Sequence, residues 1–250
     1  MDNKNFTTYR LLNRFTNLLA FTTTKQSIPE RTPHYTGDSP EQFINSRKQL
    51  AKELGLNAEQ LLFPRQTHTN NVVEIRNIPV SEIDNTDALI TNVPGICICI
   101  QTADCVPVLL FDPVKKVVAA VHAGWRGTVK KIVAETIRKM ETNYQTEAEN
   151  IVATIGASIG PEIYEVGDEV INAVRKTVPN AEKTVHLNRL GKYHFNLWEA
   201  NRQILIESGV NPENIEITGE CSFEKSEKYF SARRNGIDTG RMATGIMLKY

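Results

Sequence analysis

The sequence has no excess of charge of either sign. Its 250 residues include 29 Lys and Arg and 29 Asp and Glu, which gives a formal net charge of zero at pH 7. Proteins that bind nucleic acids or anionic membrane surfaces usually rely on a broad positive potential, and this composition offers none. We therefore expect a small-molecule partner, and neither a nucleic acid nor a membrane.

Long hydrophobic runs are absent too. The longest apolar stretches, residues 96–100 and 106–111, are far shorter than the roughly 20 residues that a membrane-spanning helix needs. Residues 1–15 mix charged and apolar side chains and lack the basic-then-apolar order of a secretory signal. These absences predict a soluble protein that is not exported.

Cysteine is scarce, with four residues in the whole chain. Cys97, Cys99 and Cys105 lie within nine positions, unlike the cysteines of a disulfide framework, which are spread along the chain. A reducing compartment, the cytoplasm, suits this pattern best. Cys97 and Cys99 project to the same face of one strand by the two-residue period, and we expect both to pack in the core.

Repeats, low-complexity tracts and Gly-, Ser- or Pro-rich linkers are also missing from the chain. Its length allows a large hydrophobic core that needs no disulfides. We therefore predict a single catalytic domain over residues 1–250.

The clearest predicted helix covers residues 40–54. Ser39 and Gln42 have the spacing of a capping box, Pro40 suits the first helical position, and Gly55 is typical of a helix end. The spacing of apolar side chains predicts further helices over residues 129–140, over residues 165–177 and between Asn196 and Gly209.

Short apolar or β-branched runs bounded by turn residues predict buried strands. They cover residues 96–101, 106–111, 117–122 and 151–155, and residues 112–116 link two of them like a hairpin loop. Helices and strands are intermixed without strict alternation. This order favours an α/β fold of the mixed-sheet α-β sandwich type over a doubly wound sheet.

Reactive side chains stand at the ends of the apolar runs, where residues usually line a pocket. They are His68, Cys105 and His122. Imidazole and thiolate both bind zinc well, and three protein ligands leave the fourth tetrahedral position open for catalysis. The spacing of these residues matches no zinc finger. Taken singly, a His or Cys at a strand end is more often a buried packing residue.

Arginines are gathered in two places that could bind an anion. Residues 124–127, Gly-Trp-Arg-Gly, precede a predicted helix and combine backbone N–H groups with Arg126, which suits a phosphate. Arg233, Arg234 and Arg241 lie near glycines close to the C-terminus. Guanidinium favours bidentate recognition of phosphate or carboxylate, whereas an exposed ion pair is the plain alternative for each arginine.

Two carboxylates and one indole are further candidates. Asp87 and Asp104 are candidate acid/base groups or partners of the metal ligands, and turn capping is their plain alternative. Trp125 is a candidate for stacking on a base, although such tryptophans more often simply pack.

These segments, in this order, resemble the laccase-domain family. It is also called the polyphenol oxidase or peptidoglycan editing factor family, and it includes bacterial zinc-dependent purine nucleoside phosphorylases. Thr69 departs from the family pattern, because a glycine usually stands there. The resemblance covers most of the chain, through residues 66–68, 86–91, 102–105, 122–128, 159–167 and 233–241.

The resemblance implies that His68, Cys105 and His122 bind zinc, with copper as a weaker candidate. It implies phosphorolysis of adenosine, inosine or S-methyl-5′-thioadenosine, with phosphate as the second substrate and adenosine deamination as a further activity. With the arguments above, it leads us to predict catalytic roles for Cys105, His122 and Asp104. The predicted substrate-binding residues are Gln66, Arg126, Arg233 and Arg241.

Other functions remain open at this point. A metal-free hydrolase or amidase could use Cys105 as nucleophile and His122 or His68 as base, which would suit peptidoglycan editing. A multicopper oxidase is excluded, because its four-copper site cannot be built from the five histidines of this chain. A non-enzymatic binding module would leave the reactive residues unexplained. The sequence leaves the oligomeric state undetermined.

Overall fold

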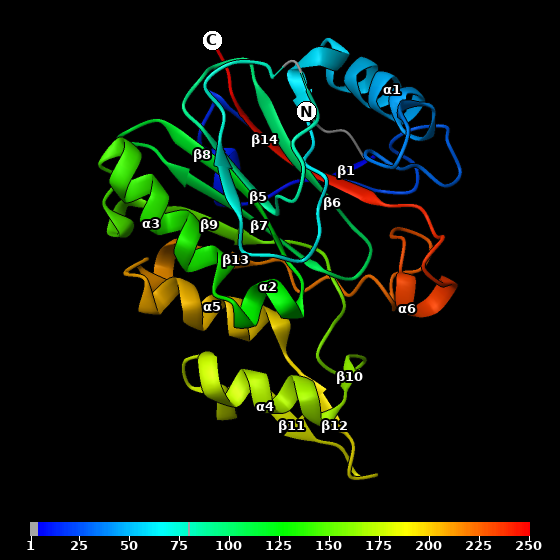
Figure 1. The fold of residues 1–250 in the computed structure, drawn as a ribbon, viewed down its shortest axis with the longest axis vertical. Coiled ribbons are helices and arrows are strands. Elements are labelled where there is room, and N and C mark those ends of the chain that lie inside the picture. The colour runs from blue at the N-terminus through cyan, green and yellow to red at the C-terminus, as the bar shows by residue number, and fades with distance from the viewer. Residues whose placement is uncertain (1–4, 80) are drawn as a thin grey trace.

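The structure is a computed structural model that describes residues 5–79 and 81–250. Its strands form three sheets within these residues, and two of the sheets stack face to face (Figure 1). Helix α1 covers the outer face of one stacked sheet, and helices α3 and α5 cover the outer face of the other. This arrangement confirms the predicted mixed-sheet α-β sandwich.

The first stacked sheet has five strands, and helix α1 (Ile44–Leu54) packs on it. Cys97 and Cys99 are fully buried in that layer, as predicted. β3 pairs with β6 in parallel, and the other pairs are antiparallel. The strand order is β1 (Phe6–Thr7), β2 (Leu18–Thr23), β14 (Met242–Leu248), β6 (Cys97–Thr102) and β3 (Leu61–Leu62).

The second stacked sheet has six strands and includes the predicted hairpin. β7 and β8 are antiparallel neighbours at its centre, and the Asp112 carboxylate caps their turn by accepting the N–H of Val114 and of Lys115. The strand order is β13 (Ile215–Ile217), β9 (Val152–Ile155), β7 (Val106–Asp112), β8 (Val117–Ala123), β5 (Ala88–Thr91) and β4 (Val72–Glu74).

The central strands read as continuous apolar runs because both of their faces are buried. Leu109 and Val118 pack between the two sheets, while Val108 and Val121 face helices α3 (Ile132–Tyr144) and α5 (Leu197–Glu207). The structure confirms four predicted strands to within a residue or two at each end, and they are β6, β7, β8 and β9.

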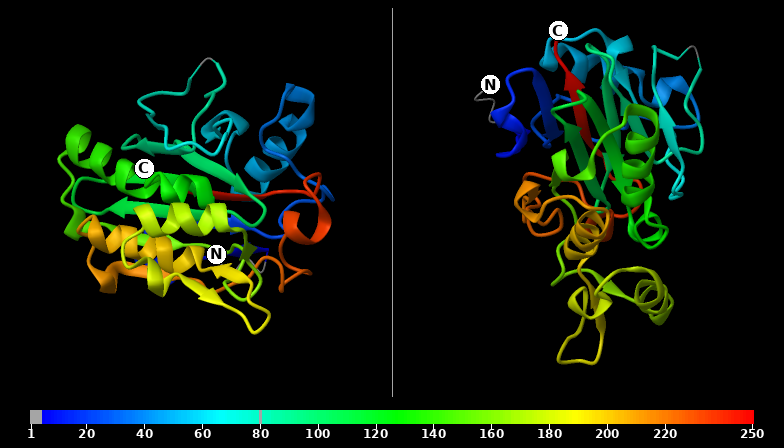
Figure 2. Two further views of the ribbon diagram at one scale, coloured as in Figure 1. Left: turned by 60° about the horizontal axis from the view of Figure 1, so that its bottom comes forward. Right: turned by 90° about the vertical axis from the view of Figure 1, so that its left-hand side faces the viewer.

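The remaining elements are a small projecting unit, two short α-helices and several 3-10 helices. A small three-stranded sheet and helix α4 form a projecting unit, seen at the bottom of Figure 1 and of the right view of Figure 2. Its elements are β10 (Glu165–Val166), α4 (Asp168–Thr177), β11 (Val185–Leu187) and β12 (Tyr193–Phe195). Two short helices, α2 (Trp125–Val129) and α6 (Ala232–Asn235), lie closer to the sheets. The 3-10 helices are Leu12–Arg14, Pro40–Gln42, Ala58–Gln60, Ala148–Asn150, Ala181–Lys183 and Pro212–Asn214.

The predicted helix over residues 40–54 is wrong at its start. Residues 40–42 form a 3-10 turn, Phe43 interrupts the helix with a φ of −136°, and the α-helix begins at Ile44. The predicted capping box is absent, because the side chain of Gln42 accepts the N–H of Asp38 instead. Gly55 ends the helix in the left-handed conformation, as predicted.

The predicted helix over residues 129–140 is two helices. Lys131 has a φ of 57°, a left-handed conformation that separates α2 from α3. The Gly-rich turn predicted over residues 124–127 is wrong, because residues 125–127 already belong to α2 and Gly124 is its N-cap. The predicted helix over residues 165–177 also starts late, because residues 165 and 166 pair with β12.

The helix expected after Asn196 is confirmed, and the Asn196 side chain accepts the N–H of Glu199 at 3.0 Å. None of the helices in the described part of the chain is both long and apolar enough to cross a membrane.

Candidate metal centre and pocket

The three predicted metal ligands come together from separate parts of the chain. Cys105 directly precedes β7 and His122 lies near the end of β8, and the pairing of Pro107 with His122 brings these strand ends side by side. The loop before β4 adds His68, whose Nε2 lies 3.9 Å from Cys105 Sγ. The ligand atoms all lie within 4.8 Å of one another. Within residues 5–79 and 81–250, no other group of three or more His, Cys, Asp or Glu side chains has this arrangement.

Asp87 organises two of these ligands. Its Oδ1 accepts hydrogen bonds from Nδ1 of His122 at 2.7 Å and from the backbone N–H of His68 at 3.0 Å. Its Oδ2 accepts from the N–H and the hydroxyl of Thr69, both at 2.7 Å. Because a carboxylate only accepts, Nδ1 of His122 carries the proton, and Nε2 is left as the ligand atom.

The same carboxylate supports an unusual backbone. His68 has a φ of 61°, in the left-handed region that residues other than glycine seldom adopt. The hydrogen bonds from residues 68 and 69 to Asp87 hold this conformation in place. Thr69 contributes its hydroxyl to the same carboxylate.

The three ligands and Asp87 form a strongly coupled group of charges. Burial alone would raise the pKa of Cys105, but the nearby imidazoles of His122 and His68 lower it to about 6. Burial alone would lower the pKa of His122, but Cys105 and Asp87 raise it to about 9. Burial would likewise raise the pKa of Asp87, and the hydrogen bond and charge of His122 hold it far below the usual range. The lowered pKa favours the Cys105 thiolate that a metal ion requires, whereas the raised pKa of His122 means that metal binding displaces the proton on its Nε2.

Gly124 leaves room for the ligands. A Cβ at this position would lie 2.8 Å from Cys105 Sγ and 3.2 Å from Cδ2 of His68, which is too close for either atom to stay where it is. The absence of a side chain at residue 124 therefore allows the two ligands to lie against the backbone that links β8 to α2.

These observations test whether the site suits a metal ion. Two imidazoles and one thiolate suit a zinc ion and leave one coordination position for water or substrate. The Asp87 contact to the second nitrogen of His122 is typical of metal-bound histidine. The donor set and its surroundings therefore suit a zinc ion.

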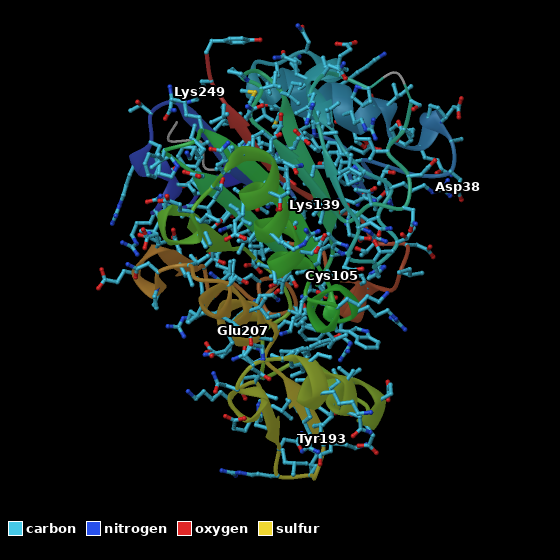
Figure 3. All side chains as sticks on the ribbon, turned by 60° about the vertical axis from the view of Figure 1, so that its left-hand side comes forward. Asp38, Cys105, Lys139, Tyr193, Glu207 and Lys249 are labelled. Carbon is cyan, nitrogen blue, oxygen red and sulfur yellow. The ribbon has the colours of Figure 1, made fainter. Side chains whose placement is uncertain are left out.

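The centre opens into a pocket of about 300 Å³. In Figure 3, Cys105 lies toward the end of the stacked sheets that faces the projecting unit, where Tyr193 is labelled. The described residues that line the pocket are Gln66, His68, Gln101, Thr102, Ala103, Cys105, His122, Ala232, Ile237 and Arg241.

The pocket contains five of the predicted site residues. Besides the three candidate ligands, they are Gln66 and Arg241, which form part of the pocket wall. The Gln66 amide donates to the backbone oxygen of Gln101 at 2.8 Å and accepts its N–H at 2.7 Å. Nη2 of Arg241 donates to the carbonyl oxygen of Ile237 at 2.7 Å, so this guanidinium also fixes the C-terminal loop.

Asp104 lies next to the pocket but is absent from its lining. Its Oδ1 accepts the hydroxyl proton of Ser222 at 2.6 Å, and its Oδ2 accepts the backbone N–H of Arg233 at 2.7 Å. Both oxygens are therefore engaged, and they tie the strand end at Cys105 to the start of α6.

Arg126 and Arg233 lie outside the pocket lining as well. The Arg126 guanidinium lies 4.4 Å from the ring centre of Trp125 and has no hydrogen-bond partner among the described residues. Arg233 donates to the backbone oxygen of Glu165 at 3.2 Å and lies over the ring of Tyr164. Both arginines are exposed, but only Arg126 of the two has no hydrogen-bond partner among the described residues and remains available to an anion.

Five residues of the lining were not predicted as site residues, and they are Gln101, Thr102, Ala103, Ala232 and Ile237. Thr102 carried a usable signal, because a hydroxyl closes an apolar strand three positions before Cys105. The others carried none, since their place depends on contacts between distant parts of the chain.

The fold and the site define an α/β protein with one candidate metal centre of two imidazoles and a thiolate at the end of a sheet. The chain belongs to the family described as multi-copper polyphenol oxidoreductase laccase, whose sequence profile matches residues 32–249. This confirms the resemblance that the ordered motifs indicated.

Characterised relatives carry names of nucleoside enzymes. A purine nucleoside phosphorylase of Bacteroides thetaiotaomicron is 38% identical to this chain, over 96% of the chain and 95% of the relative. Adenosine deaminase RL5, from an unknown prokaryotic organism, is 38% identical over 92% of this chain and 94% of its own length. The purine nucleoside phosphorylase YlmD of Bacillus subtilis is 30% identical over 93% of this chain and 88% of its own length.

Solved structures share the whole fold. The crystal structure of the hypothetical protein YfiH of Bacillus licheniformis has a TM-score of 0.90 and 30% identity, and the match covers 99% of this chain and 98% of that one. YlmD from Geobacillus stearothermophilus also has a TM-score of 0.90, with 26% identity and coverage of 100% and 98%.

Proposed function

We propose that this protein is a zinc-dependent purine nucleoside phosphorylase, with residues 1–250 as its catalytic domain. Its substrates are adenosine, inosine or S-methyl-5′-thioadenosine together with phosphate. The observation that carries the proposal is the cluster of His68, Cys105 and His122, which opens into a pocket in a chain whose relatives are named for this activity.

His68, Cys105 and His122 would hold the zinc ion. When bound, zinc would supply a Lewis acid that polarises an oxygen of phosphate or substrate. The chain supplies the setting for this chemistry. Asp87 keeps the proton of His122 on Nδ1, and the lowered pKa of Cys105 gives a thiolate at neutral pH. Copper is the weaker candidate, supported by the description of the family alone.

Phosphate is bound by the arginines around the mouth of the site. Arg126 is exposed and free of protein acceptors among the described residues, so its guanidinium can take a phosphate oxygen without giving up a hydrogen bond to the protein. Arg241 lies in the pocket wall, and Arg233 lies at the start of α6. Orientation of phosphate against the ribose C1′ would account for much of the rate.

For Asp104 we propose a role in positioning. Its carboxylate holds Ser222 and the N–H of Arg233, and it thereby fixes the loop that carries two of the substrate-binding arginines. Direct proton transfer by Asp104, which the sequence suggested, requires one of these contacts to be given up. The pH profile of Asp104→Asn separates the two roles.

Adenosine deamination is a second candidate activity of the same centre. It is supported by the 38% identity to adenosine deaminase RL5 over most of both chains. Neither the H-x-E nor the P-C-x-x-C signature of the cytidine-type deaminases occurs in the sequence. Deamination at His68, Cys105 and His122 would therefore use a different arrangement of catalytic residues.

A metal-free hydrolase or amidase is a further candidate, favoured by the pairing of a low-pKa thiol with a high-pKa imidazole. Cys105 would be the nucleophile and His122 its proton acceptor. Such an enzyme could act in peptidoglycan editing. We favour the metalloenzyme, because the second imidazole, that of His68, completes a ligand set that a thiol nucleophile does not need.

The first experiment is elemental analysis of the purified protein and of His122→Ala, with phosphate-dependent adenine release from adenosine measured on the same samples. We expect about one zinc per chain, lost together with activity in the variant. An active protein without metal would overturn the zinc proposal and favour Cys105 as a nucleophile.

Cytoplasmic location is part of the proposal. The described cysteines are all free thiols, as in proteins of reducing compartments. The net charge of zero and the named relatives support a nucleoside and phosphate as partners.

A further inference from the structure

A buried hydroxyl at the pocket lacks a partner. Thr102 is 2% exposed, and it ends β6 in the lining of the pocket. Its Oγ1 makes no hydrogen bond with any of the described residues. A hydroxyl taken out of water without a partner costs free energy, so such a group is typically satisfied by a ligand or a bound water.

Several neighbouring polar groups already have partners. The Gln101 side-chain oxygen accepts the N–H of Tyr35 at 2.9 Å, and the Gln101 backbone pairs with the amide of Gln66. The Asp104 carboxylate is occupied by Ser222 and Arg233. In this part of the lining, the hydroxyl of Thr102 is therefore without a hydrogen-bond partner among the described residues.

The position of Thr102 on its strand explains where this hydroxyl lies. By the two-residue period, Thr102 shares a face of β6 with Ile98 and Ile100, both of which pack between the two sheets. This row of side chains on β6 is apolar up to Ile100. It ends with Thr102, where the space between the sheets meets the pocket. A valine has nearly the same shape and would avoid the unpartnered hydroxyl, so packing alone does not account for threonine.

Other buried threonines provide the comparison. Thr91 donates to the carbonyl oxygen of Ile75 at 2.7 Å, and the hydroxyls of Thr22 and Thr244 bond each other at 2.7 Å. Thr154 in β9 is also fully buried and unpartnered, but it is not part of the pocket lining. Thr154 is therefore a matched control for Thr102.

We propose that Oγ1 of Thr102 hydrogen-bonds a ribose hydroxyl of the bound nucleoside. The choice of ligand rests on the proposed function. Thr102 and the three candidate metal ligands line the same pocket, so a group that contacts Thr102 from the pocket shares that pocket with the candidate metal centre. A sugar hydroxyl and a threonine hydroxyl can each donate and accept, which makes them matched partners.

The test uses three variants and two readouts. Thr102→Val removes the hydroxyl and keeps the shape, Thr102→Ser keeps the hydroxyl, and Thr154→Val repeats the change away from the pocket. We expect the dissociation constant for adenosine, measured by calorimetry on the zinc-loaded protein, to rise about threefold to tenfold in Thr102→Val. It should stay near the wild-type value in the other two variants. The melting temperature of Thr102→Val should be unchanged or raised, and its zinc content unchanged.

Deoxynucleosides identify the ribose hydroxyl. The loss of affinity in Thr102→Val should disappear with one of 2′-, 3′- or 5′-deoxyadenosine, because the partner hydroxyl is then already missing. An unchanged dissociation constant for adenosine would overturn the proposal and leave a buried water as the partner of Thr102. An equal loss with all three analogues would overturn the assignment to ribose. A wild-type protein that binds no nucleoside would instead overturn the proposed function itself.

Discussion

Asp87 lies beneath the candidate metal centre and accepts the Nδ1 proton of His122 at 2.7 Å. The carboxylate is fully buried, and it also accepts N–H groups of the loop that carries His68. One side chain therefore fixes both the orientation of the His122 ring and the backbone conformation at His68. Such a contact ties the loop before β4 to the end of β8.

This relationship predicts that Asp87→Asn weakens metal binding. An amide cannot accept at both of its positions, so either His122 or the loop of residues 67–69 loses its acceptor. We expect the affinity for zinc to fall about tenfold to a hundredfold, as for other partners of metal-bound histidine. Competition with a chromophoric chelator measures this change.

Asp112→Asn is the matched control for that variant. Asp112 is also fully buried, and its carboxylate also accepts backbone N–H groups, but it lies at the opposite end of β7. Both N–H groups bond to Oδ1, and an amide oxygen can keep these two contacts, so we expect little change in stability and an unchanged zinc affinity. Equal zinc affinities in wild type and Asp87→Asn would show that Asp87 does not support the centre.

Gly124→Ala should displace two ligands at once. The added methyl group would lie 2.8 Å from Cys105 Sγ and 3.2 Å from the ring of His68, and both side chains must move. We expect loss of most of the bound zinc and of activity from a folded protein, shown by elemental analysis and by circular dichroism. Gly167→Ala is the control, because its methyl group would meet only the mobile end of the Glu169 side chain. Full zinc content in Gly124→Ala would contradict the close approach.

The sequence predicted the parts of this fold that local pattern determines. β6, β7, β8 and β9 are apolar runs buried on both faces, and the ligands could be proposed because Cys105 and His122 stand at their ends. The helix over residues 129–140 could not be placed correctly. Its break depends on the left-handed conformation of Lys131, a residue type that gives no sign of such a turn.

Long-range contacts account for most of what the sequence did not reveal. Asp87 and His122 are 35 residues apart, and Asp104 and Arg233 are 129 residues apart. No spacing rule connects such pairs, because the pairing of distant strands brings them together. Asp104 illustrates the consequence, since a carboxylate that looked available for proton transfer has both oxygens bonded.

Asp104→Asn distinguishes positioning from proton transfer. If Asp104 positions the loop, kcat/KM falls while the pH profile keeps its shape, and stability falls by about 1–3 kcal/mol as a buried contact is lost. Ser222→Ala removes one of the same hydrogen bonds from the other side and should reproduce part of the effect. Loss of one limb of the pH profile in Asp104→Asn alone would instead support the catalytic role.

Arg126→Ala tests the phosphate site. The guanidinium is exposed and has no protein acceptor among the described residues, so its removal should cost little stability. We expect the KM for phosphate to rise about tenfold or more, because a charge-assisted hydrogen bond contributes about 1.5–3 kcal/mol. Arg138→Ala is the control, an exposed arginine on α3 that pairs with Glu135. An unchanged KM for phosphate with normal turnover would remove Arg126 from the mechanism.

Cys105 should be the reactive thiol of the metal-free protein. Its pKa is lowered to about 6, so the thiolate predominates above that pH, and alkylation by iodoacetamide should reach half of its maximal rate near pH 6. His122→Ala removes the imidazolium and should move this midpoint upward, toward the ordinary range of a thiol. Bound zinc should protect Cys105, whereas the buried Cys97 and Cys99 should stay unlabelled in every sample. Mass spectrometry of labelled peptides across pH 5 to 9 measures all three effects, and a midpoint in the ordinary thiol range for the metal-free wild type would contradict the coupling of Cys105 to His122.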